Sequence, residues 1–332
     1  MAKGEDIQEL IGSFGQPDAF RSAALRIIAD AEKRKSKLAA SMRQTLDACV
    51  RKETPRAPRS LATLSKLVDP VDELLDVIEP QRGRDQIVLS AEARGLVDTI
   101  IEEQKRAHDL RRHHLPLRSK VIFCGPPGCG KTLAAEVVAR ELNLPFYTAK
   151  LDVIISSFLG ETAANLRKLF DLASRRPCVL FLDEFDALAR DRSDNGEHNE
   201  LRRVVNSLLL FIDRYKGDGI VIAATNLEGS LDAAVWRRFD EVVYFDVPGE
   251  KEVADLLKLR FRNFPVNFEL TRESSKLKGM SYAEIERVCY EAIKYAVLKR
   301  RRVVSETEFA TAIKSEQRRK STARRIQSVH TK

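Results

Sequence analysis

The feature that most constrains this chain of 332 residues is the glycine-rich segment Gly125-Pro-Pro-Gly-Cys-Gly-Lys131-Thr132. It follows a short apolar run, Lys120–Cys124, and precedes a segment with the residue spacing of a helix. Gly128 and Gly130 permit backbone angles that point successive N–H groups toward phosphate oxygens. The N-terminus of the following helix adds partial positive charge. A strand, such a loop and a helix in succession predict a phosphate-binding loop for ATP.

The residues of this loop have separate expected roles. Lys131 supplies a full positive charge to the β- and γ-phosphates, and the Thr132 hydroxyl is a ligand for Mg²⁺. We interpret Cys129, at a variable position, as backbone filler and not as a redox switch. The alternative, a glycine-rich surface turn with an exposed lysine, is disfavoured by the complete match and its context. The nucleotide contacts expected from this segment are Gly125, Pro126, Pro127, Gly128, Cys129, Gly130, Lys131, Thr132 and Leu133.

A second apolar strand ends in two carboxylates, in Val179-Leu-Phe-Leu-Asp183-Glu184. Such a strand delivers its last side chains to the carboxyl edge of a parallel sheet, where ligands bind in folds of this type. We expect Asp183 to hold Mg²⁺ through water, and Glu184 to polarise the attacking water as a general base. A solvated turn is the alternative, and the phosphate-binding loop upstream disfavours it.

Two further polar positions follow apolar strands. Gly219-Ile-Val-Ile-Ala-Ala-Thr-Asn226 ends in an amide, which can orient the same water or contact the γ-phosphate. Arg237 and Arg238 stand beside the start of another strand, where an arginine finger would stabilise the charge that develops on the transferred phosphoryl group. Ordinary turn chemistry for Asn226 and surface ion pairs for the arginines remain the alternatives.

From about residue 85, apolar strands alternate with helical patterns, which predicts an α/β fold with a parallel sheet flanked by helices on both faces. The expected strands are Lys120–Cys124, Pro145–Ala149, Cys178–Leu182, Gly219–Ala224 and Val242–Phe245. The expected organisation is a helical N-terminal domain that binds a partner or substrate (1–52), a linker with a short helix at Val71–Ile78 (53–84), a large ATPase domain (85–248), a helical domain (249–315) and a basic tail (316–332).

Composition limits the classes of partner. Most of the net charge of +8 lies from Lys314 onward, so the body is near neutral, and we interpret the tail as a solvated or disordered end. Nucleic acid is therefore not the favoured partner. No apolar run approaches the length of a membrane span, and the N-terminus lacks the pattern of a secretory signal. The five cysteines lack the spacing of metal ligands, so we expect a cytoplasmic protein without a zinc site.

The loop, Asp183-Glu184, Asn226 and Arg237-Arg238 together resemble the Walker A, Walker B, sensor 1 and arginine-finger motifs of AAA+ ATPases. Thr225 to Asp240 is similar to the second region of homology of the AAA clade. The resemblance covers about residues 85 to 313. It implies a P-loop NTPase sheet followed by an all-helical AAA+ lid, and a homo-oligomeric ring, usually a hexamer. In such a ring the fingers reach the ATP of the neighbouring subunit.

The sequence departs from the family pattern at two places. Glu241 stands where many members carry a second finger, so the tandem arginines resemble those of protein-remodelling and microtubule-severing members. In the lid, Gly279-Met-Ser-Tyr-Ala-Glu-Ile285 stands where those proteins have Gly-Phe-Ser-Gly-Ala-Asp. The resemblance implies that Tyr282, in place of a glycine, and Ala283 lie near the adenine.

Ile155-Ser-Ser-Phe158-Leu159-Gly160-Glu161 resembles a substrate-gripping pore loop, in which an aromatic and an aliphatic side chain hold an extended polypeptide. The pattern around Phe158 fits an exposed aromatic residue, but it also fits a core phenylalanine that caps the next helix. The family resemblance favours the pore loop at Phe158 and Leu159.

Further stretches, among them Leu142-Asn-Leu-Pro145-Phe and Glu200-Leu-Arg-Arg-Val-Val-Asn206, resemble standalone bacterial AAA ATPases. These are often encoded beside a subtilisin-like serine protease, in modules linked to plasmid exclusion and phage defence. The expected function is Mg²⁺-dependent ATP hydrolysis coupled to remodelling or unfolding of a protein substrate, with proteolysis left to a partner. The alternatives are an ATP-dependent assembly switch that binds nucleic acid or a toxin-like partner without threading, and a microtubule-severing enzyme.

Overall fold

The structure, a computed structural model, describes residues 73–156, 159–185, 198–226 and 233–330. Contacts divide the chain into two units, 1–68 and 69–332, and everything described below belongs to the second. The expected helical N-terminal domain and Phe158 lie outside the described residues. Leu159 begins a helix, but its side chain is not among those described.

Six strands form one sheet in the described part of the chain, in the order β1-β3-β4-β5-β2-β6. All neighbouring strands are parallel except β1, which is antiparallel to β3. The prediction of a parallel sheet is confirmed for the five expected strands, whereas the antiparallel strand β1 was not expected. The strands are β1 Leu75–Ile78, β2 Lys120–Cys124, β3 Phe146–Ala149, β4 Val179–Leu182, β5 Ile220–Thr225 and β6 Glu241–Tyr244.

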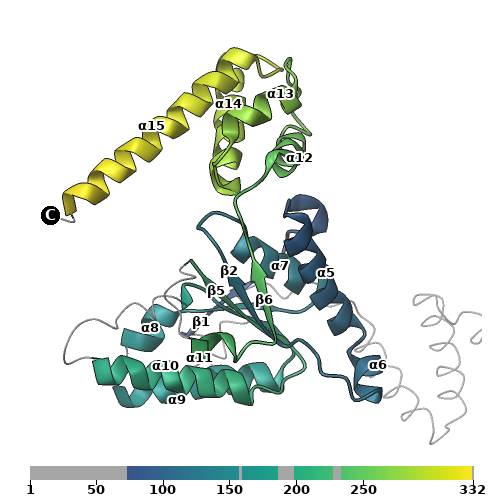
Figure 1. Cartoon of the computed structure of the whole chain (residues 1–332), viewed down its shortest axis with the longest axis vertical. Helices are drawn as coiled ribbons and strands as arrows, with labels where there is room; N and C mark the ends of the chain where they lie inside the picture. The colour runs from purple at the N-terminus through teal and green to yellow at the C-terminus, as the bar shows by residue number, and fades with distance from the viewer. Residues whose placement is uncertain (1–72, 157–158, 186–197, 227–232, 331–332) are drawn as a thin grey trace, which may run out of the picture. The chain divides into compact units, whose positions relative to one another are not determined.

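Helices cover both faces of this sheet (Figure 1). On one face, Phe123 of β2 packs in the same buried cluster as Val138 of α7. The residue before it in β2, Ile122, points to the opposite face of the sheet. There it packs in a second buried cluster with Leu169 of α9 and Ile212 of α10. Because side chains alternate along a strand, one apolar run supplies both cores. The helices of this domain are α5 Ala91–Lys105, α6 Ala107–Arg112, α7 Lys131–Leu142, α8 Leu151–Ser156, α9 Leu159–Arg175, α10 His198–Arg214 and α11 Ala233–Trp236.

The prediction of a short helix at Val71–Ile78 is wrong for the residues that the structure describes there, because Leu75–Ile78 forms strand β1. Leu75 pairs with Ala149 of β3, and the Asp76 carboxylate forms an ion pair with Lys150 at 2.9 Å. Four residues with two β-branched members gain more from pairing with an open sheet edge than from one helical turn. The sheet therefore begins ten residues before the domain boundary that we expected at residue 85.

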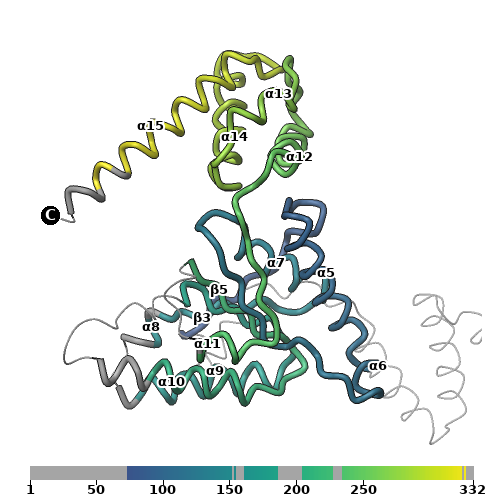
Figure 2. The backbone as a smooth tube through the Cα atoms, viewed as in Figure 1, coloured from purple at the N-terminus to yellow at the C-terminus, as the bar shows by residue number. Residues whose placement is uncertain are grey.

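The chain passes from β6 through an extended segment directly into a helical lid (Figure 2). Ser281 and Glu284 form a capping box at the start of α14, each side chain bonding the other residue's backbone N–H. α14 packs along α15. The lid helices are α12 Glu250–Arg260, α13 Leu270–Ser274, α14 Tyr282–Leu298 and α15 Glu306–His330.

The basic tail expected from residue 316 is not a separate segment, because α15 continues through this position to His330. Glu316 is 9% exposed, and its carboxylate accepts a hydrogen bond of 2.6 Å from Arg287 of α14. Lys320 forms an ion pair with Glu284 at 3.0 Å. Beyond Ile313, which is buried and apolar, these contacts with α14 hold the helix in a sequence whose composition alone predicts a solvated segment.

Candidate functional site: a nucleotide cavity between the sheet and the lid

The loop between β2 and α7 adopts the backbone angles that its glycines permit. Gly125, Gly128 and Gly130 have φ values of 136°, 77° and 94°. A side chain at Gly125 would overlap the Phe245 carbonyl of the segment after β6. Gly130 is the N-cap residue of α7, and it has no side chain that could occupy the helix N-terminus. The first N–H groups of α7 therefore point at a space that an anion can fill.

The ammonium group of Lys131 is buried and fixed by three neutral oxygen atoms. It donates hydrogen bonds to the carbonyls of Gly125 (2.6 Å) and Pro126 (3.0 Å) and to Oδ1 of Asn226 (2.8 Å). The residue is only 7% exposed. These three acceptors carry no charge, so they orient the ammonium group without forming ion pairs with it.

Asp183, at the end of β4, faces the start of α7. The Thr132 hydroxyl lies 3.3 Å from Oδ2 of Asp183, and the Glu184 N–H donates to Oδ1 at 2.9 Å. A hydroxyl and a carboxylate side by side are hard oxygen donors of the kind that Mg²⁺ takes beside a nucleotide. This pair thus fits the metal that the sequence predicts. Glu184 is exposed and has φ of 51°, a left-handed conformation that is costly for a residue with a side chain.

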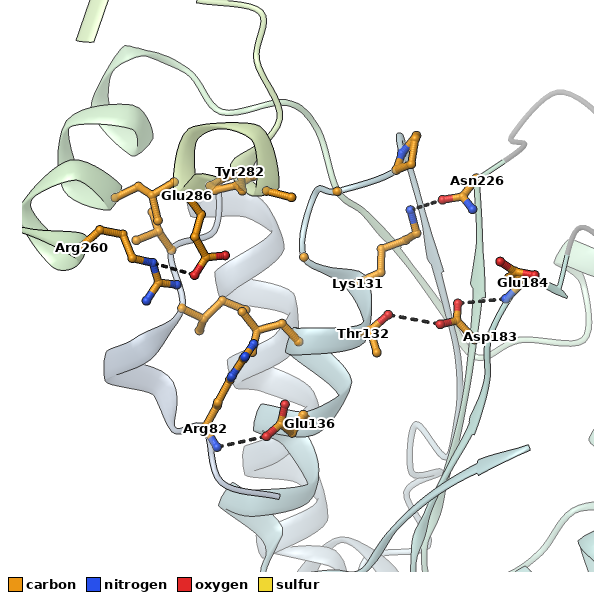
Figure 3. Close-up of a pocket in the computed structure, with 18 residues that line it drawn as sticks. Arg82, Lys131, Thr132, Glu136, Asp183, Glu184, Asn226, Arg260, Tyr282 and Glu286 are labelled. Atoms are coloured by element: carbon orange, nitrogen blue, oxygen red, sulfur yellow. Dashed lines mark hydrogen bonds and ion pairs between the residues drawn. The ribbon is translucent and has the colours of Figure 1, made fainter. Parts of the chain in front are cut away.

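These residues line a cavity of about 430 Å³ between the sheet and the lid (Figure 3). In Figure 3, Lys131, Thr132, Asp183, Glu184 and Asn226 lie at one end, and Tyr282 and Glu286 of the lid at the other. The residues that line the cavity are Arg82, Ile87, Val88, Pro127, Gly128, Gly130, Lys131, Thr132, Leu133, Glu136, Asp183, Glu184, Asn226, Leu256, Arg260, Tyr282, Ala283 and Glu286. The first end suits a charged phosphate chain, and apolar side chains of the lid in the lining, such as Leu256 and Tyr282, suit the flat base of a nucleotide.

The lid contacts the phosphate-binding loop directly. The Ala283 N–H donates to the carbonyl of Gly128 at 3.1 Å, and a side chain on Gly128 would come within 2.8 Å of Ser281 Oγ. The Tyr282 ring, which stands where the family pattern has glycine, is 9% exposed. Burial is the main cause that raises the pKa of its hydroxyl. Its ring forms part of the lid wall of the cavity.

Several residues that line the cavity were not predicted from the sequence. Ile87 and Val88 precede Ser90, whose hydroxyl caps α5 by accepting from the Ala93 N–H at 3.2 Å. That cap was a readable signal for the start of a helix. No local signal marks Arg260 or Glu286, which form an ion pair at 3.0 Å across the lid. These two come together only through the packing of α12 on α14.

Some of the expected site residues lie outside the cavity. Gly125 and Pro126 accept hydrogen bonds from Lys131 through their carbonyls but do not line the cavity. Cys129 is buried in the core, and this burial raises the pKa of its thiol. Arg237 and Arg238 are exposed on the turn between α11 and β6. Arg238 forms an ion pair with Asp213 of α10 in the same chain.

A parallel sheet, a glycine-rich phosphate-binding loop, a strand that ends in two acids and a helical lid together define a P-loop ATPase. Residues 121–247 match the family described as ATPase family associated with various cellular activities (AAA). Over 327 residues the chain is 51% identical to an uncharacterized AAA family ATPase, y4kL, of Sinorhizobium fredii, covering 98% of this chain and 99% of the relative. The chain belongs to the AAA family, and it hydrolyses ATP with Mg²⁺.

More distant relatives match over a smaller share of this chain. The chain is 36% identical over 202 residues to an ATP-dependent zinc metalloprotease FtsH of Caldicellulosiruptor bescii, covering 58% of this chain but only 33% of the relative. It is 31% identical over 294 residues to a proteasome-activating nucleotidase of Methanococcus maripaludis, covering 77% of this chain and 72% of the relative. Among the described residues, no helix is both long and apolar enough to span a membrane.

Proposed function

We propose that the chain works as an oligomeric ring, a hexamer by analogy with its family, that uses ATP hydrolysis to remodel or unfold a protein substrate. One observation carries the proposal of a ring. The cavity holds the phosphate-binding loop, both acids and Asn226, whereas Arg237 and Arg238 lie outside its lining. This position supports arginine fingers that act on the ATP of a neighbouring subunit.

The names of two relatives support a protein substrate. One is an ATP-dependent metalloprotease and the other activates the proteasome, so in both the nucleotide is associated with proteolysis. This sequence contains no His-Glu-x-x-His and no Gly-x-Ser-x-Gly motif of its own. A separate protease, subtilisin-like by the sequence resemblance, would then cleave what the ring unfolds. A place in bacterial defence is part of the same proposal.

Phe158 and Leu159 would grip the polypeptide. The test uses the full chain with a folded, tagged protein substrate, and measures ATPase activity and unfolding separately. Phe158→Ala is expected to keep basal ATPase activity and lose unfolding, while Phe158→Tyr, which retains an aromatic ring, keeps both. Unfolding by Phe158→Ala at the wild-type rate would contradict a threading motor.

Light scattering with nucleotide tests assembly. Glu184→Gln keeps ATP binding but removes the general base, so it is expected to hold ATP and give a stable ring. Lys131→Ala removes the charge that binds phosphate and is expected to stay in the smaller form. If neither the wild-type chain nor Glu184→Gln forms a larger species with ATP, the proposal of a ring fails.

The second candidate is an ATP-dependent switch that binds nucleic acid without threading. Exposed cations on the last turns of α15, Arg318, Arg319 and Arg325, favour it. Binding through phosphate contacts falls by powers of ten between low and physiological salt. The switch would be favoured if the chain binds nucleic acid with this salt dependence and loses the binding when the three arginines are changed to glutamine. Its absence at low salt eliminates the nucleic-acid form.

A further inference from the structure

Arg82 is a cation of the nucleotide cavity to which no sequence motif assigns a role. It lies in the segment that joins β1 to α5. Figure 3 shows its side chain running from the flank of α7 into the space between Thr132, at the phosphate end, and Glu286 of the lid. Arg82 is thus placed between the ends of the cavity that fit the terminal phosphates and the base.

The backbone beneath Arg82 is fixed to α7 and α5. The N–H groups of Gln81 and Arg82 both donate to Oε1 of Glu136, at 3.0 and 3.2 Å. Glu136 stands one helical turn after Thr132, on the same side of α7. Two residues on, Arg84 forms ion pairs with Asp98 (3.3 Å) and Glu141 (3.2 Å). The segment is therefore a rigid support for the Arg82 side chain.

The two other cations that line the cavity, Lys131 and Arg260, already have hydrogen-bonding partners. Arg260 pairs with Glu286, whose Oε1 also accepts from the Tyr290 hydroxyl at 3.0 Å. Lys131 is held by Asn226 and the loop carbonyls. The guanidinium of Arg82, by contrast, forms no ion pair with any residue in the ranges that the structure describes. Arg82 is an exposed cation on the cavity lining, so its guanidinium is available to an anionic ligand.

We propose that Arg82 binds the α-phosphate of the nucleotide, the phosphate nearest the sugar. Its planar guanidinium donates two parallel hydrogen bonds to non-bridging phosphate oxygens, a geometry that lysine does not reproduce. Thr132 marks the β- and γ-phosphate end, and Tyr282 with Ala283 marks the base end, so the phosphate between them is the one within reach. The inference rests on nucleotide binding in this cavity, and it does not require a ring or a protein substrate.

The test is equilibrium binding to the full chain of ATP, ADP and adenosine, each measured by displacement of a fluorescent ADP. Arg82→Ala is expected to raise the Kd of both ADP and ATP about tenfold, the effect of one hydrogen bond to a charged group, and to leave that of adenosine unchanged. Arg111→Ala is the matched control. It removes an exposed arginine of α6 that neither lines the cavity nor supports the segment of Arg82, and all three affinities should stay within about twofold.

A second pair of variants tests how Arg82 is positioned. Glu136→Gln keeps an oxygen that accepts the two N–H groups, whereas Glu136→Ala removes it. Glu136→Ala is expected to weaken ADP binding, and adding Arg82→Ala to it should cause little further loss, because the two residues act through one contact. Glu136→Gln should restore most of the affinity. Fully additive losses would show that Glu136 does not act through Arg82.

Three outcomes overturn the proposal for Arg82: an unchanged Kd for ADP, an equal loss for adenosine, or a loss confined to ATP. The last would place Arg82 on the γ-phosphate. Because these measurements need neither hydrolysis nor unfolding, they stand even if the chain proves not to be a remodelling motor. Conversely, a normal Kd in Arg82→Ala would leave the proposed motor untouched.

Discussion

Lys131 donates a hydrogen bond of 2.8 Å to Oδ1 of Asn226, which joins the start of α7 to the end of β5. The acceptor is an uncharged amide, so it positions the ammonium group without neutralising it. The side chain that the sequence assigns to the attacking water or the γ-phosphate thus also orients the lysine that binds phosphate.

This contact predicts that Asn226→Asp harms nucleotide binding more than Asn226→Ala. A carboxylate at this position would form an ion pair with Lys131 and compete with the phosphates for its charge, whereas alanine removes only a neutral acceptor. The difference between a charged and a neutral hydrogen bond corresponds to about a tenfold higher Kd for ATP in Asn226→Asp. Titration with a fluorescent ATP analogue measures it, and equal affinities of the two variants would contradict this role.

Gly128 serves both the loop and the lid. Its φ is 77°, and an added Cβ would lie 2.8 Å from Ser281 Oγ and 3.2 Å from the Ala283 side chain. Gly128→Ala is therefore expected to lose ATP binding, because the loop is strained and the lid is displaced. Gly95→Ala is the matched control, since a Cβ on Gly95 in α5 meets nothing within 4 Å and alanine favours a helix.

Thermal unfolding and ATP titration of the two glycine variants separate the effects. Gly95→Ala should bind ATP normally and be slightly more stable, by about 0.5–1 kcal/mol. Gly128→Ala should keep a folded core but show no rise in Tm when ATP is added. If ATP raises the Tm of Gly128→Ala as much as that of the wild-type chain, the close contact between loop and lid is not needed for ATP binding.

Buried thiols predict a loss of stability at alkaline pH. Burial raises the pKa of Cys178 and of Cys289 to about 12, from an ordinary value of 9.0. As the pH rises, these thiols ionise in the unfolded state before they ionise in the folded state. The contribution of the buried thiols to the free energy of unfolding is therefore complete below pH 9 and decreases as the pH rises toward 12. At pH 10.5 the loss is about 2 kcal/mol for each thiol.

Urea unfolding at pH 8 and pH 10.5 measures this effect. Cys178→Ala with Cys289→Ala should flatten the pH dependence while lowering the stability at both pH values. A residual slope is expected from Cys129, Tyr215 and Tyr282, because burial raises the pKa of these groups as well. An unchanged slope in the double variant would contradict the assignment to the thiols.

Features of the fold and the site that depend on local sequence patterns could be predicted from the sequence. Continuous apolar runs marked β2 and β4, and the residues that follow each run define the phosphate end of the cavity. Strand β1 was missed because four residues gain strand structure only by pairing with β3, which lies about seventy residues later. The end of α15 was misread for a similar reason, since its contacts with Arg287 and Glu284 join residues far apart in the chain.

The base end of the cavity was only partly predictable. Tyr282 and Ala283 came from a family pattern, but Arg82 and Arg260 belong to no motif. Their positions depend on how the segment before α5 and the helix α12 pack around α7 and α14. Side chains that meet through tertiary packing leave no fixed spacing in a sequence, so only the structure reveals them.

The central claim is that the catalytic site is completed by the neighbouring subunit. Glu184→Gln removes the general base but keeps ATP binding and the arginines, and the double variant Arg237→Ala, Arg238→Ala keeps the general base but lacks the fingers. ATPase activity is measured for each variant alone and for a mixture in which co-assembly is verified by pull-down through a tag on one variant. Fingers that act between subunits predict two inactive preparations and recovered activity in the mixture, because some interfaces then pair an intact Glu184 with intact arginines of the neighbouring subunit. A co-assembled mixture as inactive as its components, or full activity of the finger variant alone, would contradict the account.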